Sequence, residues 1–496
     1  MNDLQNILTA LTARTPGALA FTSVQFIVFF TLLYTLFTFV PSRPAVRNRL
    51  LLIFSLYFYF RLSGPGIVIL LLISLCDFCL AKLIHKSSED RKRTWLIICS
   101  AIIDIGALAY FKYANFFLAQ WHSISQQAEI FVPVTMLVPI GISYYVFKSL
   151  GYVIDIYRGT LEEPETDFFT YLLYTSFFAT IIAGPISRAR ELLPQFNSKV
   201  KITQAMVSAG LFLILSGVFK KVFIADFIAM NFLDRVIESP TYFSGFENIL
   251  ALIASPIQVY CDFSGYTDMA LGLALLFGIE IKNNFNVPFK AKSVTEFWRR
   301  WHITLLDWFN EYLFSPLSLA LRSWGKAATV TAIFITFLMS GLWHGASWTF
   351  IVWGALHGTM MVLEYFTANW RGSRVNKTAQ RVIQAIWAGL SFIFICATFV
   401  LFKSASLASA ATVFDKIISG FDFDVVAKWF EIYYGVFFMI VLGYTMHFFP
   451  GKYEERLSVK FGRLHWFWQA VVIAAGIYVI YQAVSADTKP FIYLEF

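Results

Sequence analysis

A histidine lies in the middle of a long apolar stretch, within the segment SGLWHGASW at residues 340–348. Burying a polar group without a partner costs about 1 to 3 kcal/mol by mutational estimates, so this imidazole needs either a partner or a task. Because the pKa of an unperturbed imidazole is about 6.5, His344 can accept a proton from a reacting hydroxyl group. Small neighbours leave room for a ligand, and Trp343 can form a cavity wall. The alternative is a core histidine that hydrogen-bonds across helices, and the pattern alone leaves both open.

A second histidine, His302, lies in the segment SVTEFWRRWHITLLDWFNEYLF at residues 293–314. On a helix, the apolar side chains of this segment form one stripe and most of its charged side chains lie opposite. The stripe consists of Val294, Phe297, Trp298, Trp301, Leu305, Trp308 and Tyr312. We therefore expect one amphipathic helix at the cytoplasmic interface of a membrane. His302 lies at the edge of the stripe, where a capping or anchoring histidine is the alternative to a catalytic one.

Four further polar residues lie in apolar surroundings, where ionisable groups are functional candidates by default. His357 and Glu364 are about two turns apart on one expected helix, and we interpret them as structural partners. Asp262 and Asp268, in the segment YCDFSGYTDM, are placed to line a cavity or to bind a cation. A structural hydrogen-bonding role is favoured for both.

The composition indicates what kind of protein carries these residues. Of 496 residues, 58% are hydrophobic, 18% are aromatic and 14% are charged, with a mean hydropathy of +0.64. A soluble domain has about 25% charged residues, so we predict an all-α polytopic membrane protein. The net charge of +8 comes from short Lys and Arg runs between apolar spans, which favours cytoplasmic loops over nucleic-acid binding. The five cysteines lie in or beside apolar spans and are interpreted as packing residues.

The charged loops predict the orientation of the chain. The loops at 43–49 and 82–93 are basic and are expected in the cytoplasm, with the far end of a hairpin at RLSGPG between them. The loop at 119–131 has no Lys or Arg and is expected outside, whereas 371–381 and 451–463 are basic again. This alternation places both termini outside the cytoplasm and predicts about ten to twelve spanning helices of roughly 20 residues each. The first apolar run lacks a basic start and is interpreted as a retained helix, not a cleaved signal.

We treat the chain, 1–496, as one integral membrane domain with N-terminal helices at 21–130, a core at 131–370 and C-terminal helices at 380–484. In the core, the apolar runs are short and are interrupted by glycine, proline and charged residues. Such backbone is tolerated at membrane depth where it is buried in protein or lines a cavity. We therefore expect re-entrant segments around a water-accessible site, and a helical hairpin at 327–366 that breaks at SGLWHGAS.

Motifs for several other chemistries are missing from the sequence. It contains no HExxH motif for zinc hydrolysis, no GxSxG motif for a serine nucleophile and no Walker A motif for ATP. The seven histidines do not cluster at metal-ligand spacing, so no metal is expected. Without a nucleophilic cysteine beside His344, direct transfer between bound donor and acceptor fits better than a covalent enzyme intermediate. A channel or transporter is the non-enzymatic alternative, although matched broken helices in two halves are not found.

Five motifs in a fixed order carry a family resemblance that covers about residues 20 to 370. They are VPIGISYYVFKSLGYVIDIYRG, AGPISRARELLPQF, VYCDFSGYTDMALGLALLFGI, NNFNVPFKAKSVTEFWRRWHITLLDWFNEYLF and GLWHGASWTFIVWGALHG. With them the sequence resembles the membrane-bound O-acyltransferase (MBOAT) family, in the bacterial branch that O-acetylates alginate or modifies peptidoglycan and teichoic acid. The resemblance implies a helical ring with re-entrant segments around a central tunnel.

The resemblance also implies a reaction and two roles. His344 matches the family's catalytic histidine, and His302 matches its second polar residue, which is Asn in some branches. The implied reaction moves an acetyl group from a cytoplasmic thioester, acetyl-CoA or an acyl carrier, to an extracytoplasmic polysaccharide, directly or through a secreted SGNH-like acyltransferase. The implied location is the bacterial inner membrane, with no bound cofactor and no nucleic acid. Transfer of D-alanine from a carrier protein to a cell-envelope polymer, or transfer to a lipid, is the alternative.

Candidate substrate contacts follow from the same motifs. Four basic residues, Lys290, Lys292, Arg299 and Arg300, lie where CoA phosphates or an acidic carrier protein would dock. The alternative is that they are ordinary positive charges of cytoplasmic loops. The candidates are Trp343, Trp301, Asp262, Ser264, Lys290, Lys292, Arg299 and Arg300.

Overall fold

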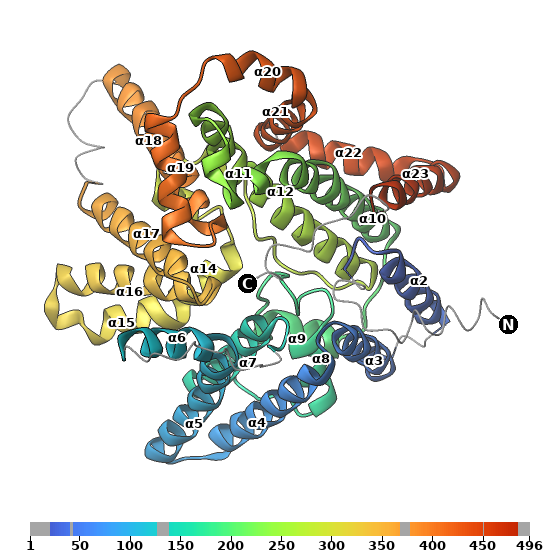
Figure 1. The fold of residues 1–496 in the computed structure, drawn as a ribbon. Helices are drawn as coiled ribbons and strands as arrows, with labels where there is room; N and C mark the ends of the chain where they lie inside the picture. Colours follow the sequence, from blue (N-terminus) through green and yellow to red (C-terminus); the bar gives the residue numbers. More distant parts are fainter. Residues whose placement is uncertain (1–19, 40–42, 126–137, 368–376, 450, 485–496) are drawn as a thin grey trace. The chain divides into compact units, whose positions relative to one another are not determined.

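Every regular element in the described part of the chain is a helix, as the composition predicts. The computed structural model describes residues 20–39, 43–125, 138–367, 377–449 and 451–484 (Figure 1). The chain divides into two compact units. The first comprises Met1–Leu215, Met269–Lys282 and Val459–Glu495, and the second comprises Ser216–Asp268, Asn283–Ser458 and Phe496.

The first unit is built mainly from the N-terminal helices. It contains α2 (Val24–Phe39), α3 (Pro44–Ser63), α4 (Ile67–Lys86), α5 (Asp90–Leu108), α6 (Ala114–Ile124), α7 (Ile142–Arg158), α8 (Phe168–Ser176), α9 (Ala189–Asn197), most of α10 (Gln204–Val218) and α23 (Trp466–Val484). A short turn at Gly64–Gly66 separates α3 from α4, where the sequence predicts the end of a hairpin. Helices α4, α5 and α7 pack against one another, and α3 packs against α8.

Irregular backbone in the first unit is buried in protein, as expected for the core of the sequence. Residues 177–188 form no helix, yet all of them are buried. Their polar groups find partners nearby: the N–H of Phe178 donates to Ser55 Oγ at 3.1 Å, and the Tyr174 hydroxyl donates to the carbonyl of Ser187 at 3.2 Å. Such bonds replace the water that an exposed loop would use.

The second unit holds the remaining helices. It contains three π-helical segments (Phe219–Asp226, Ala229–Leu233 and Asn310–Phe314), α11 (Asp234–Glu238), most of α12 (Gly245–Leu276), α13 (Val294–Trp298), α14 (Ile303–Phe309), α15 (Ser315–Ala320), α16 (Lys326–His344), α17 (Trp348–Thr367), α18 (Lys377–Lys403), α19 (Leu407–Ser419), α20 (Asp424–Ile432), α21 (Tyr434–Phe448) and most of α22 (Gly451–Arg463). Helix α17 packs against α16, α18 and α13, so it joins the elements that carry the two candidate histidines.

The predicted hairpin at 327–366 is confirmed as α16 and α17, which are separated by only three residues. Glycines let the two helices approach closely. A Cβ atom on Gly341 would overlap the carbonyl oxygen of Phe350, and one on Gly354 would meet the carbonyl oxygen of Phe337 at 2.5 Å. Neither position has space for a side chain, so the contact depends on glycine. This contact fixes the C-terminal end of α16, where His344 lies.

The expectation of one continuous helix at 293–314 is wrong. Helix α13 ends at Trp298 and α14 begins only at Ile303. His302, at the start of α14, has φ 46° and ψ 50°, a left-handed conformation that a right-handed α-helix does not contain. The predicted apolar stripe is nevertheless buried at all seven positions. Burial selects apolar side chains along a segment without requiring that the segment stay one helix.

Four helical stretches in the described residues are long and apolar enough to span a membrane, and a fifth is added if the bent pair α20 and α21 counts as one. The four are Pro44–Lys86, Asp90–Ile124, Lys326–His344 and Gln380–Lys403. A multi-pass membrane protein is therefore confirmed, while the count of ten to twelve spans, the location of 293–314 at the interface and the central tunnel stay predictions. Both termini and parts of the loops at 119–131 and 371–381 lie outside the described residues.

Candidate functional site

His344 is the last residue of α16, and it is 3% exposed. Aromatic rings surround its imidazole. The ring centroids of Trp343, Trp353 and Phe402 each lie 5.1 Å from it, all in edge-on geometry, and that of Phe350 lies 6.3 Å away. These rings exclude water, and exclusion of water strengthens any electrostatic interaction between the imidazole and a substrate.

His302 is 1% exposed and lies at the break between α13 and α14. Its ring centroid is 4.7 Å from that of Phe263 on α12 and 5.8 Å from that of Trp343 on α16. A left-handed conformation costs a non-glycine residue on the order of 1 to 3 kcal/mol and persists only where its surroundings impose it. Such strained residues cluster at active sites and ligand clamps, so the backbone itself marks His302 as a functional candidate.

Trp343 is the element that the two histidines share. Its indole ring contacts the imidazole of His344 on one hand and that of His302 on the other, and it is 4% exposed. The structure therefore brings together two titratable side chains from separate helices around one indole wall. Two imidazoles so placed can serve one substrate in different roles, as a base and as a group that orients or stabilises charge.

His357 is a structural residue, as the sequence predicts. The indole N–H of Trp298 on α13 donates to His357 Nδ1 at 3.2 Å, and His357 Nε2 lies 3.1 Å from the hydroxyl of Thr398 on α18. Both ring nitrogens are therefore occupied by neighbouring helices. His357 ties α13 and α18 to α17.

Glu364 is also structural, and its role is more specific. Its carboxylate accepts the backbone N–H groups of Val294 and Thr295 at 2.8 Å each, and the Thr295 hydroxyl at 2.5 Å. It also accepts the indole N–H of Trp387 at 3.0 Å. The first N–H groups of a helix have no partner within that helix, and Glu364 supplies one for α13.

Asp262 and Asp268 both form ion pairs with lysines of the π-helical segment Phe219–Asp226. Lys221 Nζ lies 2.6 Å from Asp262 and 2.8 Å from Asp226, and Lys220 Nζ lies 2.7 Å from Asp268. These bonds agree with the structural role that the sequence favours for both carboxylates. Asp262 directly precedes Phe263, whose ring lies 4.7 Å from that of His302 between centroids.

The remaining residues that the sequence suggests as substrate contacts have different surroundings. Ser264 is 2% exposed on α12, and its hydroxyl has no hydrogen-bond partner in the described part of the chain. The indole of Trp301 is buried against Phe285 and Phe399, at 5.1 and 5.2 Å between centroids. Arg300 is committed to Glu296, at 2.8 Å.

A pocket of about 400 Å³ lies against the break between α13 and α14. Arg299 opens onto it, and Ile303, the residue after His302, forms part of its wall. The pocket is lined by Thr295, Trp298, Arg299, Ile303, Leu306, Asp307, Asn310, Phe314, Ile333, Thr336, Phe337 and Met361. It is the described cavity that comes nearest to His302 along the chain.

A second pocket, of about 710 Å³, adjoins the first, because Thr295, Ile333 and Met361 line both. Lys292, Lys326 and Glu364 are among its lining residues. Lys290 is exposed but lines neither pocket. The two pockets are therefore neighbours, one lined in part by Lys292 and Lys326 and the other by Arg299 and Ile303.

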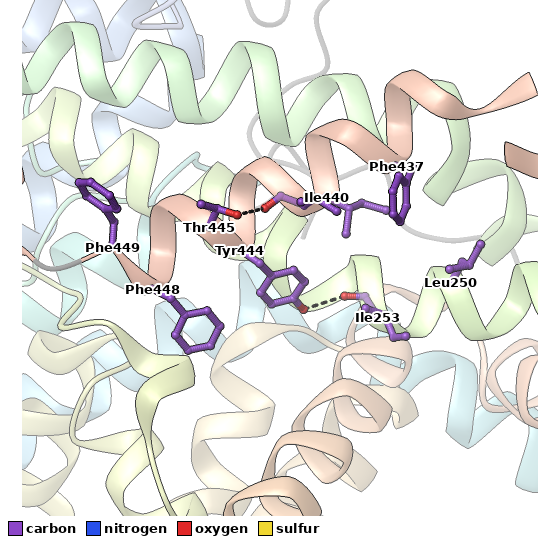
Figure 2. A pocket seen from close by; sticks show the side chains of 9 residues that line it. Leu250, Ile253, Phe437, Ile440, Tyr444, Thr445, Phe448 and Phe449 are labelled. Atoms are coloured by element: carbon purple, nitrogen blue, oxygen red, sulfur yellow. Dashed lines mark hydrogen bonds between the residues drawn. The ribbon is translucent and has the colours of Figure 1, made fainter. Parts of the chain in front are cut away.

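A third pocket, of about 640 Å³, is apolar and lies between α12 and α21 (Figure 2). The hydroxyl of Tyr444 donates to the carbonyl of Ile253 at 2.8 Å, and that of Thr445 donates to the carbonyl of Val441 at 2.7 Å. With its polar groups already bonded and rings such as Phe437 and Phe448 on its walls, this pocket suits an apolar group and offers no chemistry of its own.

No metal site or disulfide is visible in the part of the chain that the structure describes. There, no three histidine, cysteine or carboxylate side chains gather as ligands. All five cysteines are free, and Cys261 and Cys396 are buried as packing residues while Cys79 and Cys99 are exposed on helix surfaces.

Comparison with known proteins identifies the family. Residues 160–410 match the model of the membrane-bound O-acyltransferase family. The chain is 36% identical to a probable alginate O-acetylase of Pseudomonas syringae over 77% of this chain and 74% of that protein. It is 33% identical to a peptidoglycan O-acetyltransferase of Helicobacter pylori over 76% and 75% of the two chains. The chain belongs to the membrane-bound O-acyltransferase family.

As a member of the membrane-bound O-acyltransferase family, the protein is an acyltransferase. The matched region contains both histidines, their shared indole and both basic pockets. A more distant relative, a teichoic acid D-alanyltransferase of Bacillus subtilis, is 26% identical over 67% of this chain and 85% of its own length.

Sequence reasoning missed one buried polar residue near His302. Asn284 is fully buried in the loop before α13, where its side chain bonds to Thr304. The available signal was a polar pair, Asn283 and Asn284, directly before Phe285. That signal is weak, because asparagine is common in turns for purely local reasons.

Proposed function

We propose that this membrane O-acyltransferase takes an acetyl group from acetyl-CoA on the cytoplasmic side and delivers it for O-acetylation of an extracytoplasmic polysaccharide. Delivery occurs directly or through a secreted SGNH-like acyltransferase. The observation that carries the proposal is the convergence of His344 and His302, both buried, on the indole of Trp343. Relatives named for O-acetylation of alginate and peptidoglycan support an acetyl group and a glycan acceptor.

In this proposal His344 is the general base. It takes the proton of the acceptor hydroxyl as the hydroxyl oxygen attacks the thioester carbonyl. The C–S bond then breaks, the ester forms, and the imidazolium returns the proton to the leaving thiolate. His302 orients the thioester and stabilises the negative charge that develops on the carbonyl oxygen. Only the acyl group crosses, so the CoA anion never enters the apolar region.

The two neighbouring pockets support a docking place for the donor. A phosphate-bearing donor would find Lys292 and Lys326 in one pocket and Arg299 in the other. Neutralising Lys292 and Arg299 together should raise the KM for acetyl-CoA, and more so at low salt, because exposed charges are screened at high salt. Lys290→Gln, at an exposed position outside both pockets, is the matched control. An unchanged KM at every ionic strength would contradict a role in donor binding and would leave these residues as ordinary positive charges of cytoplasmic loops.

The runner-up is transfer of D-alanine from a small acidic carrier protein, supported by the D-alanyltransferase relative. The two proposals differ in the donor. Protein reconstituted in vesicles should release free CoA from acetyl-CoA in the presence of a soluble glycan acceptor such as alginate oligosaccharide. The same vesicles with His344→Ala should not. If wild-type vesicles turn over only a carrier-bound thioester, the acetyl-CoA proposal is wrong and the runner-up replaces it.

The orientation has its own test. An epitope inserted at 122–128 should be reached by an impermeant reagent in intact cells, whereas one at 373–378 should be protected, because the second segment is basic and the first is not. Equal labelling of both, or of neither, contradicts the proposed topology.

A further inference from the structure

The loop before α13, residues 283–290, pairs with the break that carries His302. The N–H of Ile303 donates to the carbonyl of Asn284 at 3.0 Å, and the N–H of Asn286 donates to the carbonyl of Arg300 at 2.9 Å. The guanidinium of Arg300 returns a bond to the carbonyl of Asn286 at 3.2 Å. The break is therefore held on both sides of His302 by bonds to one loop.

Strain is concentrated in this pairing. In the described part of the chain, the two non-glycine residues with positive φ are His302 and Val287, both at 46°. Val287 lies in the bracing loop and His302 in the braced segment. Val287 is β-branched, and a β-branched residue in the left-handed region is a genuine outlier, so the backbone of the bracing loop is itself imposed by tertiary contacts.

The side chain of Asn284 bonds to Thr304, two residues after His302. Its Oδ1 accepts the Thr304 hydroxyl at 2.6 Å and lies 3.4 Å from the Thr304 N–H. Its Nδ2 has no hydrogen-bond partner in the described residues, although the side chain is fully buried. An amide buried at the cost of an unpaired N–H is not explained by packing, since an apolar residue would fill the space without that cost.

We propose that Asn284 is a positioning residue: it acts through Thr304 to hold His302 in its left-handed conformation, with the imidazole against Trp343. Together the backbone carbonyl and the side-chain oxygen of Asn284 hold two consecutive residues after His302. The inference rests on the proposed role of His302. It adds that the geometry of His302 is set by a residue that need not touch either substrate.

Positioning and plain structural support predict different kinetics. When a positioning residue is lost, the imidazole stays in the protein but leaves its productive place, so kcat falls while the KM for acetyl-CoA stays nearly constant. A displacement of about 1 Å can cost on the order of 10²-fold in rate. If the residue acts only through His302, its loss has no further effect once the imidazole is gone.

The experiment measures CoA release from acetyl-CoA by the full-length protein in vesicles, for Asn284→Ala, His302→Ala and the double variant. Asn284→Ala should lower kcat about 10- to 100-fold with little change in KM. The double variant should be no slower than His302→Ala alone. Asn283→Ala, an exposed neighbour of the same type, is the matched control and should keep wild-type kcat.

Thr304 supplies a second, milder pair of variants in case Asn284→Ala fails to fold. Thr304→Val removes the hydroxyl that Asn284 accepts and should lower kcat, whereas Thr304→Ser keeps it and should restore activity. Multiplicative loss in the double variant, or equal kcat in the valine and serine variants, overturns the positioning role. If His302→Ala itself has wild-type kcat, the proposed role of His302 fails first, and that result is distinguishable from failure of Asn284 alone.

Discussion

The two histidines of the site are held in opposite ways. His344 ends a regular helix, and what fixes it is apolar: close glycine contacts between α16 and α17 and a ring of aromatic side chains. His302 lies in a strained break, and what fixes it is polar: bonds from the preceding loop and, through α13, from Glu364. One histidine depends on packing, the other on hydrogen bonds.

This difference predicts which kind of substitution would displace each histidine. Close packing has few discrete alternatives, so the place of His344 changes only if the hairpin itself is disrupted. A strained segment held by individual bonds is lost more easily, because each bond contributes a separate part of the restraint. The histidine that we propose as the general base, His344, is thus on the element held by close packing.

The largest effect is expected at His344. A positioned general base contributes about 10²- to 10⁴-fold to rate, so His344→Ala should nearly abolish O-acylation while the protein still accumulates. The measurement is alkali-labile acetyl on exported polysaccharide, normalised to protein amount. His357→Ala is the structural counterpart and should lower protein amount more than activity per molecule. Wild-type acylation by His344→Ala at equal protein level contradicts its role as base.

A smaller effect is expected at His302, because orienting an acyl group is a lesser demand than moving a proton. His302→Ala should reduce the rate by on the order of 10- to 100-fold. His302→Asn should retain more activity than His302→Ala, since asparagine is polar and tolerates the left-handed conformation. Equal loss in both variants would show that neither property matters.

Glu364 should stabilise the segment that carries His302, which is held by hydrogen bonds, and not the hairpin that carries His344. Glu364→Ala leaves two α13 N–H groups without their partner, and hydrogen bonds to a charged group contribute about 1.5 kcal/mol or more each. Thermal unfolding in detergent, followed by tryptophan fluorescence, should therefore begin at a lower temperature. Glu296→Ala, an acidic residue on the same segment that is about a third exposed, is the control with a smaller shift. Unchanged unfolding of Glu364→Ala contradicts its bracing role.

A sharper test replaces each of the two histidines once with glycine and once with alanine. In the left-handed region alanine is about 1 kcal/mol less favourable than glycine, so His302→Gly should be more stable than His302→Ala. In a helix the order reverses, because glycine costs up to about 1 kcal/mol relative to alanine, so His344→Ala should be more stable than His344→Gly. The same unfolding assay measures all four variants. The same order at both positions would remove the distinction between the two sites.

The smallest effect concerns pH. Burial raises the pKa of Glu296, but the N–H of Lys292 and the Arg300 guanidinium outweigh it and hold the pKa below its ordinary value. The ionised form is therefore favoured in the folded state, and its contribution is present above the ordinary pKa and lost as pH falls through the lowered one. Glu296→Gln should remove this acid-dependent part, which for a pair that is about a third exposed is below about 1 kcal/mol. If the free energy of unfolding of the wild type and that of Glu296→Gln change in parallel with pH below about pH 5, this contribution of Glu296 is contradicted.

The sequence by itself determined the class of protein and marked the residues that we propose for the site. Apolar length and low charge predicted an all-helical membrane protein, the break at SGLWHGAS predicted the hairpin, and the unusual location of His344 marked it before any fold was known. His357 and Glu364 were assigned correctly as structural partners. These features are readable because periodicity, glycine content and polarity act along the chain over a few turns.

Only the tertiary structure decided what happens at His302. The local pattern at 293–314 favours one helix, but bonds from the preceding loop outweigh it: the carbonyl of Asn284 accepts the N–H of Ile303, and the N–H of Asn286 donates to the carbonyl of Arg300. Left-handed backbone at a histidine costs free energy locally, so no local rule predicts it. Contacts between segments outweigh that cost, and they also bring His302 and His344 to one indole. The physical reason is that strain is stable only where the rest of the fold imposes it.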